Sequence, residues 1–474
     1  MSARVERGAA GALAVATVAW WLLVPSYPNY DAYYHLVWGR ELLDGLRPTF
    51  EAYAAPTQHP LYVAVAAILG LAGTVAERLL VLVALLSLVA LVWGTWRLAR
   101  ALFGAWPAAL AALFVGSSFA FLLYAVRAYV DVGFLALVLW AAVLEVERPG
   151  RFAAMGLLVA AGLLRPEAWL LAGLLWLWRA PAASTRERML LAVAVVAAPA
   201  LWALVDLAVT GDPLHSVRAT SALAEDLGRE RGLARVPRLF VVYLTDVARA
   251  PVAAAGVLGA VLALWRLGAR RLAVPLALLG TGVLTYVGTG VAGLAILPRY
   301  LTVPAVALCV FAGYAVAGFT TLAPGGRGRT AWARGAAVAA VVGLAFFAWK
   351  LPSFGTLAGE LRFGRDSHRD LVALLDVPAV RRGLRCGPLT FPTFRLVPDS
   401  RWLRDLPPER VGARSVRRPA TGVAVVITGG KALERYGQAA GISRATNRVP
   451  PGFALVARRG RFAAHVACAG RLGT

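Results

Sequence analysis

Long apolar runs separated by short polar breaks fill the first 350 residues of the chain. Most of these runs approach the roughly 20 residues that a helix needs to cross a bilayer. The pattern therefore predicts a polytopic α-helical membrane protein with about eleven spans, some of them short. We expect these spans near 9–25, 78–97, 106–125, 131–146, 152–165, 168–179, 189–208, 250–267, 272–290, 300–319 and 332–350.

The arginines orient these spans, because basic residues concentrate in cytoplasmic loops. If the apolar stretch 60–75 is not a span, the arginine clusters all fall on one side; if it is, every later segment reverses. We therefore interpret 60–75 as a re-entrant or surface helix. Met1 is then cytoplasmic and Thr474 external, in a plasma membrane. The clusters placed inside are Arg4 with Arg7, Arg97 with Arg100, Arg148 with Arg151, the arginines of 179–188, those of 266–271 and those of 327–334.

A polar stretch from Pro28 to Leu61 follows the first span, inside an outward loop 26–77. At helical spacing Asp31, His35 and Leu42 share a face, which predicts an amphipathic helix at the membrane surface. Asp31 stands at its start, where unpaired N–H groups favour a carboxylate. A helix cap and a catalytic role both explain that position. The other notable residues here are Tyr30, Tyr33, Tyr34, Trp38, Arg40, Glu41 and Asp44.

Composition narrows the class of partner. The chain is 59% hydrophobic, which excludes a soluble globular protein, and its formal net charge is +24. Only Lys350 and Lys431 are lysines, and no basic module with interleaved aromatic residues accompanies the arginines. Nucleic acid is therefore not an expected partner.

A few lone charges stand at the outward ends of the predicted spans. Placing a charged group at the edge of an apolar helix costs free energy, so such residues are candidates for function. A helix-end arginine often only extends toward the interface, however, without any further role. Their convergence on the side of Asp31 favours one shared cavity. These residues are Arg127 and Asp131, Arg165 and Glu167, and Arg299 beside Tyr300.

Two regions lie outside the predicted membrane core 1–350. The outer loop 206–249 is strongly charged and is interpreted as a surface helix with a mobile portion, either simply solvated or acting as a substrate lid. Residues 351–474 predict a small external α/β domain. We expect its strands after Gly387, Gly422 and Gly452, and its helices at 371–383 and 432–440.

The cysteines add one expectation. In an oxidising compartment Cys386 and Cys468 would form a disulfide that closes most of the external domain, the alternative being two buried thiols. Cys309 lies within an apolar run and is expected to be inert.

Together these features resemble the GT-C membrane glycosyltransferases, especially the protein O-mannosyltransferase, aminoarabinose transferase and arabinofuranosyltransferase groups. The resemblance is carried by the acid just after the first span, the continuation Tyr33-Tyr34-His35, the helix that begins at His59-Pro60-Leu61 and the arginine that opens the second span. The motif Arg127-Ala-Tyr-Val-Asp131 resembles the second outward acid of that group. Many relatives have two adjacent acids where this chain has Asn29-Tyr30-Asp31, and the second proline after His59 is missing. The subfamily and the question of a metal therefore stay open.

The resemblance implies transfer of a sugar from a polyprenyl-phosphate donor to an acceptor hydroxyl on a glycan, lipid or protein at the outer face of the membrane. Asp31 would be the general base, with Asp131 as a second acid. Arg127, Arg165 and Arg299 are the candidates for the donor phosphate. The resemblance implies no particular cofactor, and Asp31, Asp131 and Glu167 could bind one divalent cation or none. The candidate substrate contacts are Tyr34, His35, Gln58, His59, Glu167 and Tyr300.

Two other classes compete with this interpretation. A transporter or flippase of lipid-linked sugars would also be polytopic, but it typically has an internal repeat and interrupted helices in corresponding positions. A non-catalytic scaffold with an outer interaction domain leaves the clustered outward charges unexplained.

Overall fold

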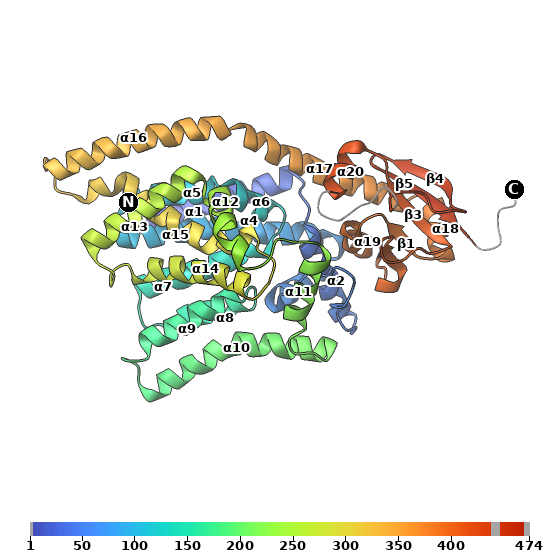
Figure 1. Ribbon diagram of the computed structural model, residues 1–474, viewed down its shortest axis with the longest axis horizontal. Helices are drawn as coiled ribbons and strands as arrows, with labels where there is room; N and C mark the ends of the chain where they lie inside the picture. Colours follow the sequence, from blue (N-terminus) through green and yellow to red (C-terminus); the bar gives the residue numbers. More distant parts are fainter. Residues whose placement is uncertain (1–2, 438–445, 469–474) are drawn as a thin grey trace.

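The computed structural model describes residues 3–437 and 446–468. Its membrane part is a bundle of long helices that run roughly along the long axis of the molecule, with a small α/β domain at one end (Figure 1). Among the described residues, six helices are long and apolar enough to cross a membrane, or seven if one bent pair is a single span. Each of the predicted spans coincides with a helix or a bent pair. The helices of the bundle are α1 (Ala3–Leu23), α4 (Ala76–Phe103), α5 (Ala105–Gly116), α6 (Phe119–Val126), α7 (Val130–Glu147), α8 (Phe152–Gly162), α9 (Glu167–Arg179), α10 (Thr185–Thr210), α13 (Ala250–Leu267), α14 (Ala273–Val291), α15 (Thr302–Ala317) and α16 (Arg327–Lys350).

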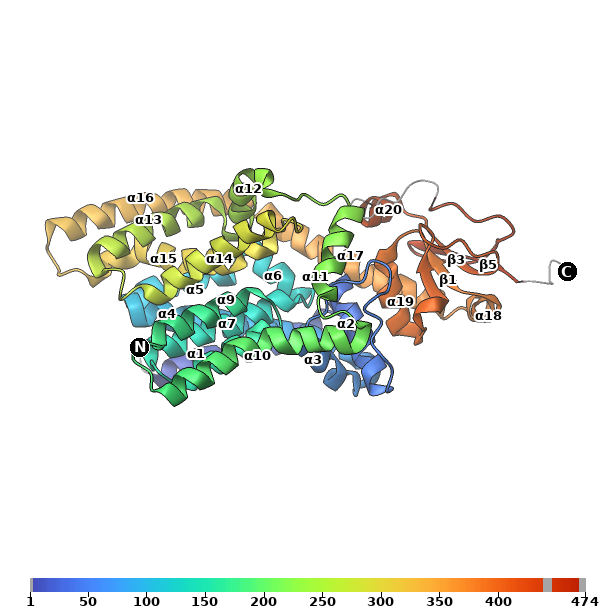
Figure 2. The same cartoon turned by 60° about the horizontal axis from the view of Figure 1, so that its bottom comes forward.

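The centre of the bundle is α15, which is almost completely buried. Glycines let its neighbours approach closely, as is usual between membrane helices. A methyl group at Gly259 of α13 would collide with the carbonyl of Phe311, and one at Gly313 would collide with the carbonyl of Pro107 in α5. By contrast, α16 is largely exposed and runs along the edge of the bundle (Figures 1 and 2).

Two helices of the bundle are broken at the same level. The axes of α5 and α6 differ by 56°, and Arg249 separates α12 (Val236–Ala248) from α13. Arg249 donates to the Phe114 carbonyl at 2.8 Å and the Ser117 carbonyl at 3.3 Å, while Ser118 Oγ donates to the Val247 carbonyl at 3.0 Å. Backbone groups freed by each break thus find a partner at the other, which is how membrane proteins tolerate such breaks.

The helix predicted in loop 26–77 is α2 (Tyr30–Leu43), and its place at the membrane surface stays a prediction. Most of α2 is buried beneath α3 (Pro60–Gly70) and α19 (Val397–Arg404). Arg40 donates to the carbonyls of Arg401 and Trp402 at 2.8 and 2.9 Å. The α/β domain therefore covers part of the surface of α2. The stretch 60–75 forms the 11-residue α3 and the short helix η1 (Gly73–Val75), and α3 is too short to cross a bilayer.

The outer loop contains two helices, α11 (His215–Asp226) and α12, joined through η2 (Leu233–Arg235). The backbone between them is tied to the segment before α15: the Ile296 amide donates to the Glu230 carbonyl at 2.9 Å, and Arg231 forms an isolated bridge with Ala295.

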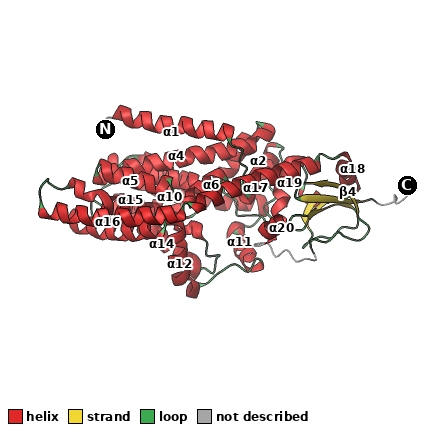
Figure 3. Ribbon diagram, turned by 90° about the horizontal axis from the view of Figure 1, so that it is seen from above, coloured by secondary structure: helices red, strands yellow, loops and turns green. Residues whose placement is uncertain are grey.

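The α/β domain contains a five-stranded sheet in the order β2-β1-β3-β5-β4, counted over the described residues. The β1–β2 and β1–β3 pairs are parallel, and the β3–β5 and β4–β5 pairs are antiparallel. Figure 3 shows the sheet at the end of the molecule, beyond α19 and α20. Its strands are β1 (Leu389–Phe391), β2 (Val411–Ala413), β3 (Gly422–Ile427), β4 (Ala454–Arg459) and β5 (Phe462–Ala467).

The sequence placed three of these strands but missed β2, which has three residues, and β5, which is rich in alanine, a weak strand former. The helix expected at 371–383 is two helices, α17 (Pro352–Leu375) and α18 (Pro378–Cys386), because Pro378 cannot continue the first. The helix expected at 432–440 is α20 (Gly430–Gly437), and its last three predicted residues lie outside the described residues.

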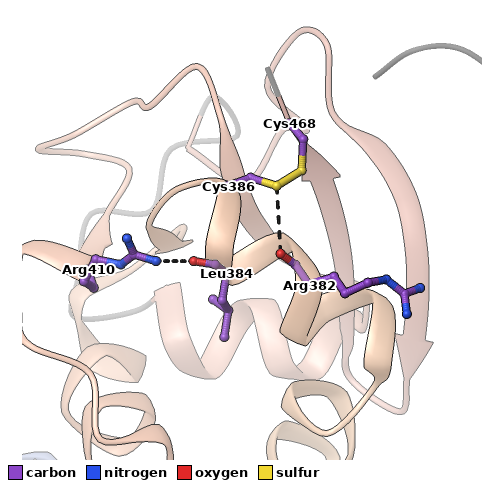
Figure 4. Close-up of a disulfide and its surroundings, with 5 residues drawn as sticks. All are labelled: Arg382, Leu384, Cys386, Arg410 and Cys468. Carbon is purple, nitrogen blue, oxygen red and sulfur yellow. Dashed lines mark hydrogen bonds between the residues drawn. A yellow bond between two sulfur atoms is a disulfide. The ribbon is translucent and has the colours of Figure 1, made fainter. Parts of the chain in front are cut away.

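The predicted disulfide between Cys386 and Cys468 is confirmed, with the two Cα atoms 5.1 Å apart. It joins the end of α18 to the residue after β5 (Figure 4). Cys309 is buried and free, as expected.

Candidate active site

A cavity of about 2290 Å³ lies between the end of the bundle and the α/β domain. It is lined by the start of α2, the turns before α7, α9 and α15, the α11 region, and α17, α19 and α20. The sequence had assigned several of its wall residues to the site. They are Asp31, His59, Arg127, Arg165, Glu167, Arg299 and Tyr300.

Asp31 lies on the cavity wall but does not cap its helix. The cap of α2 is Asn29, whose Oδ1 accepts from the Ala32 amide at 3.0 Å. Asn29 also donates to the Arg127 carbonyl through its amide, at 2.8 Å, and its side chain, at 3.0 Å. The cap explanation of Asp31 is therefore wrong. Its carboxylate is 31% exposed and lies 3.4 Å from Arg299 Nη1.

Arg165 is held by two acids, Asp131 behind the cavity wall and Glu167 on it. It pairs with Asp131 from the start of α7 and with Glu167 from the start of α9, and its guanidinium lies 5.3 Å from the centre of the Tyr300 ring. The Asp131 side chain has 0% exposure and does not line the cavity. This arrangement fixes the turns before α7, α9 and α15 relative to one another.

Arg127 is differently placed, although it belongs to the same motif as Asp131. No carboxylate lies within ion-pair distance of its guanidinium in residues 3–437 and 446–468. It packs against α17, where a methyl group at Gly364 would lie 2.6 Å from its Nη1. Across this part of the cavity stands Asp399 of α19. Burial raises the pKa of Asp399 to about 7, and the charge of Arg127 opposes that shift.

His35 and His59 form a stacked pair behind Asp31, with ring centres 5.2 Å apart. The Nδ1 atom of His35 is 2.7 Å from the backbone carbonyl of Asp31, so His35 contacts the backbone of the acid and not its carboxylate. Burial lowers the pKa of His35 to about 4 and that of His59 well below its usual value. Both rings are therefore neutral at physiological pH. They hold the start of α2 in place without adding charge near Asp31.

Two other predicted contact residues are buried away from the cavity wall. Tyr34 packs with Trp38 and Phe50 in an aromatic cluster. Gln58 donates to Asp206 at 3.1 Å. The structure thus places both side chains behind the wall, together with His35 and Asp131.

Sequence reasoning missed several wall residues, notably Arg229 from the outer loop and Arg395 and Asp399 from the α/β domain. The charged segment around Arg229 had been interpreted as either solvated or a substrate lid, without a role for this arginine in the site. Nothing local distinguishes Arg395 from the many other arginines of the domain. Among the described residues, no group of three or more His, Cys, Asp or Glu side chains could hold a metal ion.

The side of the cavity nearest the bundle is apolar. It is lined by α6, α9, α10 and α14, with Leu123, Leu170, Ala203 and Leu284 on its wall. One continuous cavity therefore joins an apolar region between membrane helices to a charged region beneath the α/β domain.

Comparison with known proteins connects this geometry to a solved structure. No family model and no curated protein matches the chain. The crystal structure of ArnT from Cupriavidus metallidurans in the apo state matches over 97% of this chain and 98% of that one, with a TM-score of 0.55 and 15% sequence identity. The chain has the fold of that structure over nearly its whole length. The resemblance seen in the sequence is therefore confirmed at the level of the fold, and it extends well beyond the residues that first indicated it.

Proposed function

We propose that the protein is a glycosyltransferase that moves a sugar from a polyprenyl-phosphate donor to an acceptor hydroxyl at the outer face of the membrane, with Asp31 as general base. The observation that carries the proposal is the position of Asp31 in the cavity. It is an accessible carboxylate beside a guanidinium, where an apolar region between helices meets a charged region. The GT-C fold supports the same reaction class.

In the proposed reaction the acceptor hydroxyl attacks the anomeric carbon of the sugar. The carbon–oxygen bond to phosphate breaks, and its electron pair leaves with the phosphate. Asp31 takes the hydroxyl proton as the new bond forms, the kind of transfer that contributes about 10²- to 10⁴-fold to rates. Arg299, 3.4 Å from Asp31, offsets the repulsion between the carboxylate and an anionic donor.

The three arginines proposed for the donor phosphate are not equivalent in this mechanism. Arg165 is engaged by Asp131 and Glu167, so binding phosphate would expose a buried acid pair. We assign it a positioning role and give the phosphate to Arg299, with Arg127 as a second contact from the opposite wall. The lipid tail occupies the apolar side between α9, α10 and α14, where it stays within the bilayer.

The decisive experiment replaces Asp31 with asparagine, which keeps the shape of the side chain and removes the base. Purified protein is incubated with a panel of radiolabelled polyprenyl-phosphate sugars, with and without chelator. Asp31→Asn should lower transfer by about 10³-fold or more while donor binding persists. Full activity in this variant would end the assignment of the base. Loss of donor binding together with transfer would indicate a structural role.

The same preparation separates the enzyme from a flippase. A flippase moves the labelled lipid between leaflets without consuming it, whereas a transferase releases polyprenyl phosphate. The broken helices α5–α6 and α12–α13 do not by themselves favour transport, because Arg249 and Ser118 satisfy the freed backbone groups at the breaks. The proposal also includes the outward orientation of the cavity, the transfer of a sugar and the hydroxyl group of the acceptor.

A further inference from the structure

The turn between α6 and α7 contains an alanine in the left-handed conformation. The φ angle of Ala128 is +53°. Its amide donates to the Ala125 carbonyl at 3.1 Å, and the Tyr129 amide donates to the Tyr124 carbonyl at 2.9 Å. This pair of hydrogen bonds ends a helix through one left-handed residue, a position that glycine usually occupies. A side chain there costs free energy, so Ala128 stores backbone strain at the edge of the candidate site.

A tyrosine hydroxyl holds the strained peptide. Tyr62 of α3 donates to the Ala128 carbonyl at 2.7 Å, and both groups are buried. The ring of Tyr62 packs against the edge of His35, with ring centres 5.0 Å apart, so the histidine pair behind Asp31 also orients Tyr62. The carbonyl before it, that of Arg127, accepts from the amide and the side chain at position 29. Two consecutive carbonyls of the turn are therefore held, one by α3 and one by the cap of α2.

The left-handed residue determines which side chains of the turn face the cavity. Arg127 and Tyr129 both line the cavity, whereas Ala128 between them has 0% exposure. Two residues later, Asp131 lies behind the wall and pairs with Arg165. An extended or right-handed conformation at Ala128 would send the chain in another direction. Arg127 and Tyr129 would then no longer share the cavity wall while Asp131 keeps its partner.

A second wall of the cavity has the same arrangement. The φ angle of Ala54 is +57°, and its carbonyl accepts from the Tyr30 hydroxyl at 2.5 Å. Tyr30 is adjacent to Asp31 in sequence, and Tyr30 and Ala54 both line the cavity. Among the described residues, four other than glycine have a positive φ, and two of them are alanines with a carbonyl bound by a tyrosine hydroxyl. Strain of this kind persists where the surrounding structure enforces it, and it concentrates at functional sites.

We propose that Tyr62 is a positioning residue of the transfer reaction, which holds Ala128 in the left-handed conformation and thereby presents Arg127 and Tyr129 to the substrate. This inference rests on the proposed function, in which Arg127 contacts the donor phosphate. Tyr62 does not line the cavity, so it acts through the turn and not by touching the substrate. Without the hydroxyl, the turn would relax, because alanine favours negative φ. A displaced contact group then contributes less to the rate.

Steady-state kinetics of the full-length protein in nanodiscs test this inference. Tyr62→Phe keeps the ring and removes the hydroxyl. Transfer from a radiolabelled polyprenyl-phosphate sugar should fall by about tenfold, as expected for one lost hydrogen bond. Tyr286→Phe is the matched control and should transfer at the wild-type rate. Its buried hydroxyl has no hydrogen-bond partner among the described residues, and Tyr286 does not line the cavity.

A glycine at position 128 separates positioning from a general loss of structure. Glycine adopts a positive φ without steric cost, so the turn should keep its conformation without the tyrosine hydroxyl. Ala128→Gly alone should lose little activity. Adding it to Tyr62→Phe should recover most of the tenfold loss. If Tyr62 only stabilised the bundle, this rescue would not occur, because glycine adds no contact that replaces the missing hydrogen bond.

The arginine that the turn presents gives a second readout. Arg127→Gln should lower transfer by about tenfold in the wild-type background. In the Tyr62→Phe background the same change should have much less effect, because the guanidinium is already displaced. Two residues that act through one contact are not additive, whereas independent sites are.

The outcomes separate the inference from the proposed function. Wild-type transfer by Tyr62→Phe would overturn the inference and leave the proposed function standing. A loss that Ala128→Gly does not reduce, or that adds fully to the loss in Arg127→Gln, would have the same consequence. Failure of the wild-type protein to transfer any sugar of the polyprenyl-phosphate panel would overturn the proposed function and the inference with it.

Discussion

The two ends of the helical bundle use arginine in opposite ways. At the end far from the cavity, three arginines pair with carboxylates of neighbouring helices. At the cavity end, Arg127, Arg229 and Arg395 point into shared space without a carboxylate partner among the described residues. The pairs at the far end are Arg97 with Glu147, Arg100 with Glu6 and Arg179 with Glu145.

Whether an arginine is paired with a carboxylate distinguishes structural charges from candidate functional ones better than its position in the sequence does. Each far-end pair joins two helices, and both of its charges are satisfied within the protein. Arg165 belongs with these pairs despite its location, since Asp131 and Glu167 engage it fully. The unpaired arginines have no carboxylate partner among the described residues, so an anion in the cavity would supply their counter-charge. Pairing is therefore the property that experiments should vary.

The largest expected effect concerns the orientation of the two ends and is all-or-none. Arg151→Cys lies in the exposed turn between α7 and α8, and Val416→Cys lies on the α/β domain, where Val416 is 58% exposed. A membrane-impermeant maleimide applied to intact cells should label only Val416→Cys, because the positive-inside rule predicts that the basic turns face the cytoplasm. The native cysteines do not interfere, since Cys309 is buried and the other two form the disulfide. Labelling of both variants from outside would refute the topology.

Local pattern was enough to predict the membrane architecture. Spans were found because apolar length is a property of consecutive residues, and Asp31 and Arg127 stood out because charge is rare beside such runs. The burial of α2 could not be seen, because it depends on Arg401, which pairs with Glu41 at 2.5 Å from the distant α/β domain. The same limit hid Arg229 and Arg395. Their proximity to Asp31 is created by long-range packing, and no short segment of sequence encodes it.

The next largest effect should come from breaking the pairing of Arg165, a carboxylate-paired arginine at the cavity end of the bundle. Arg165→Gln leaves Asp131 buried without its cation, which typically costs 3–5 kcal/mol. We expect a clearly lower melting temperature in detergent. Adding Asp131→Asn to the same chain should recover most of the loss, since the uncompensated charge is then gone. An unchanged melting temperature in Arg165→Gln, or no recovery in the double variant, would contradict the structural role of this arginine.

A smaller effect is expected when an unpaired arginine is displaced and not removed. In Gly364→Ala the new methyl group would lie 2.6 Å from Arg127 Nη1, so the guanidinium must shift. Alanine suits a helix better than glycine, so α17 should not lose stability. Transfer should nevertheless fall by about tenfold, as when one charged hydrogen bond is lost. Gly359→Ala in the same helix has open space around it and is the control. Equal activity in the two variants would show that Arg127 does not contact the substrate.

The smallest effect should come from a paired arginine at the far end, and it completes the comparison. Arg97 and Glu147 remain 31% and 22% exposed as side chains, so water screens their attraction and the pair contributes only about 0–1 kcal/mol. Arg97→Gln should therefore lower the melting temperature slightly and leave transfer and donor affinity unchanged, whereas Arg127→Gln should weaken transfer by about tenfold with little change in stability. The two variants make the same chemical change at opposite ends of the bundle, and steady-state kinetics with thermal melts measures both. If Arg97→Gln reduced transfer as much as Arg127→Gln, the loss would reflect general damage to the bundle, and the distinction between paired and unpaired arginines would fail.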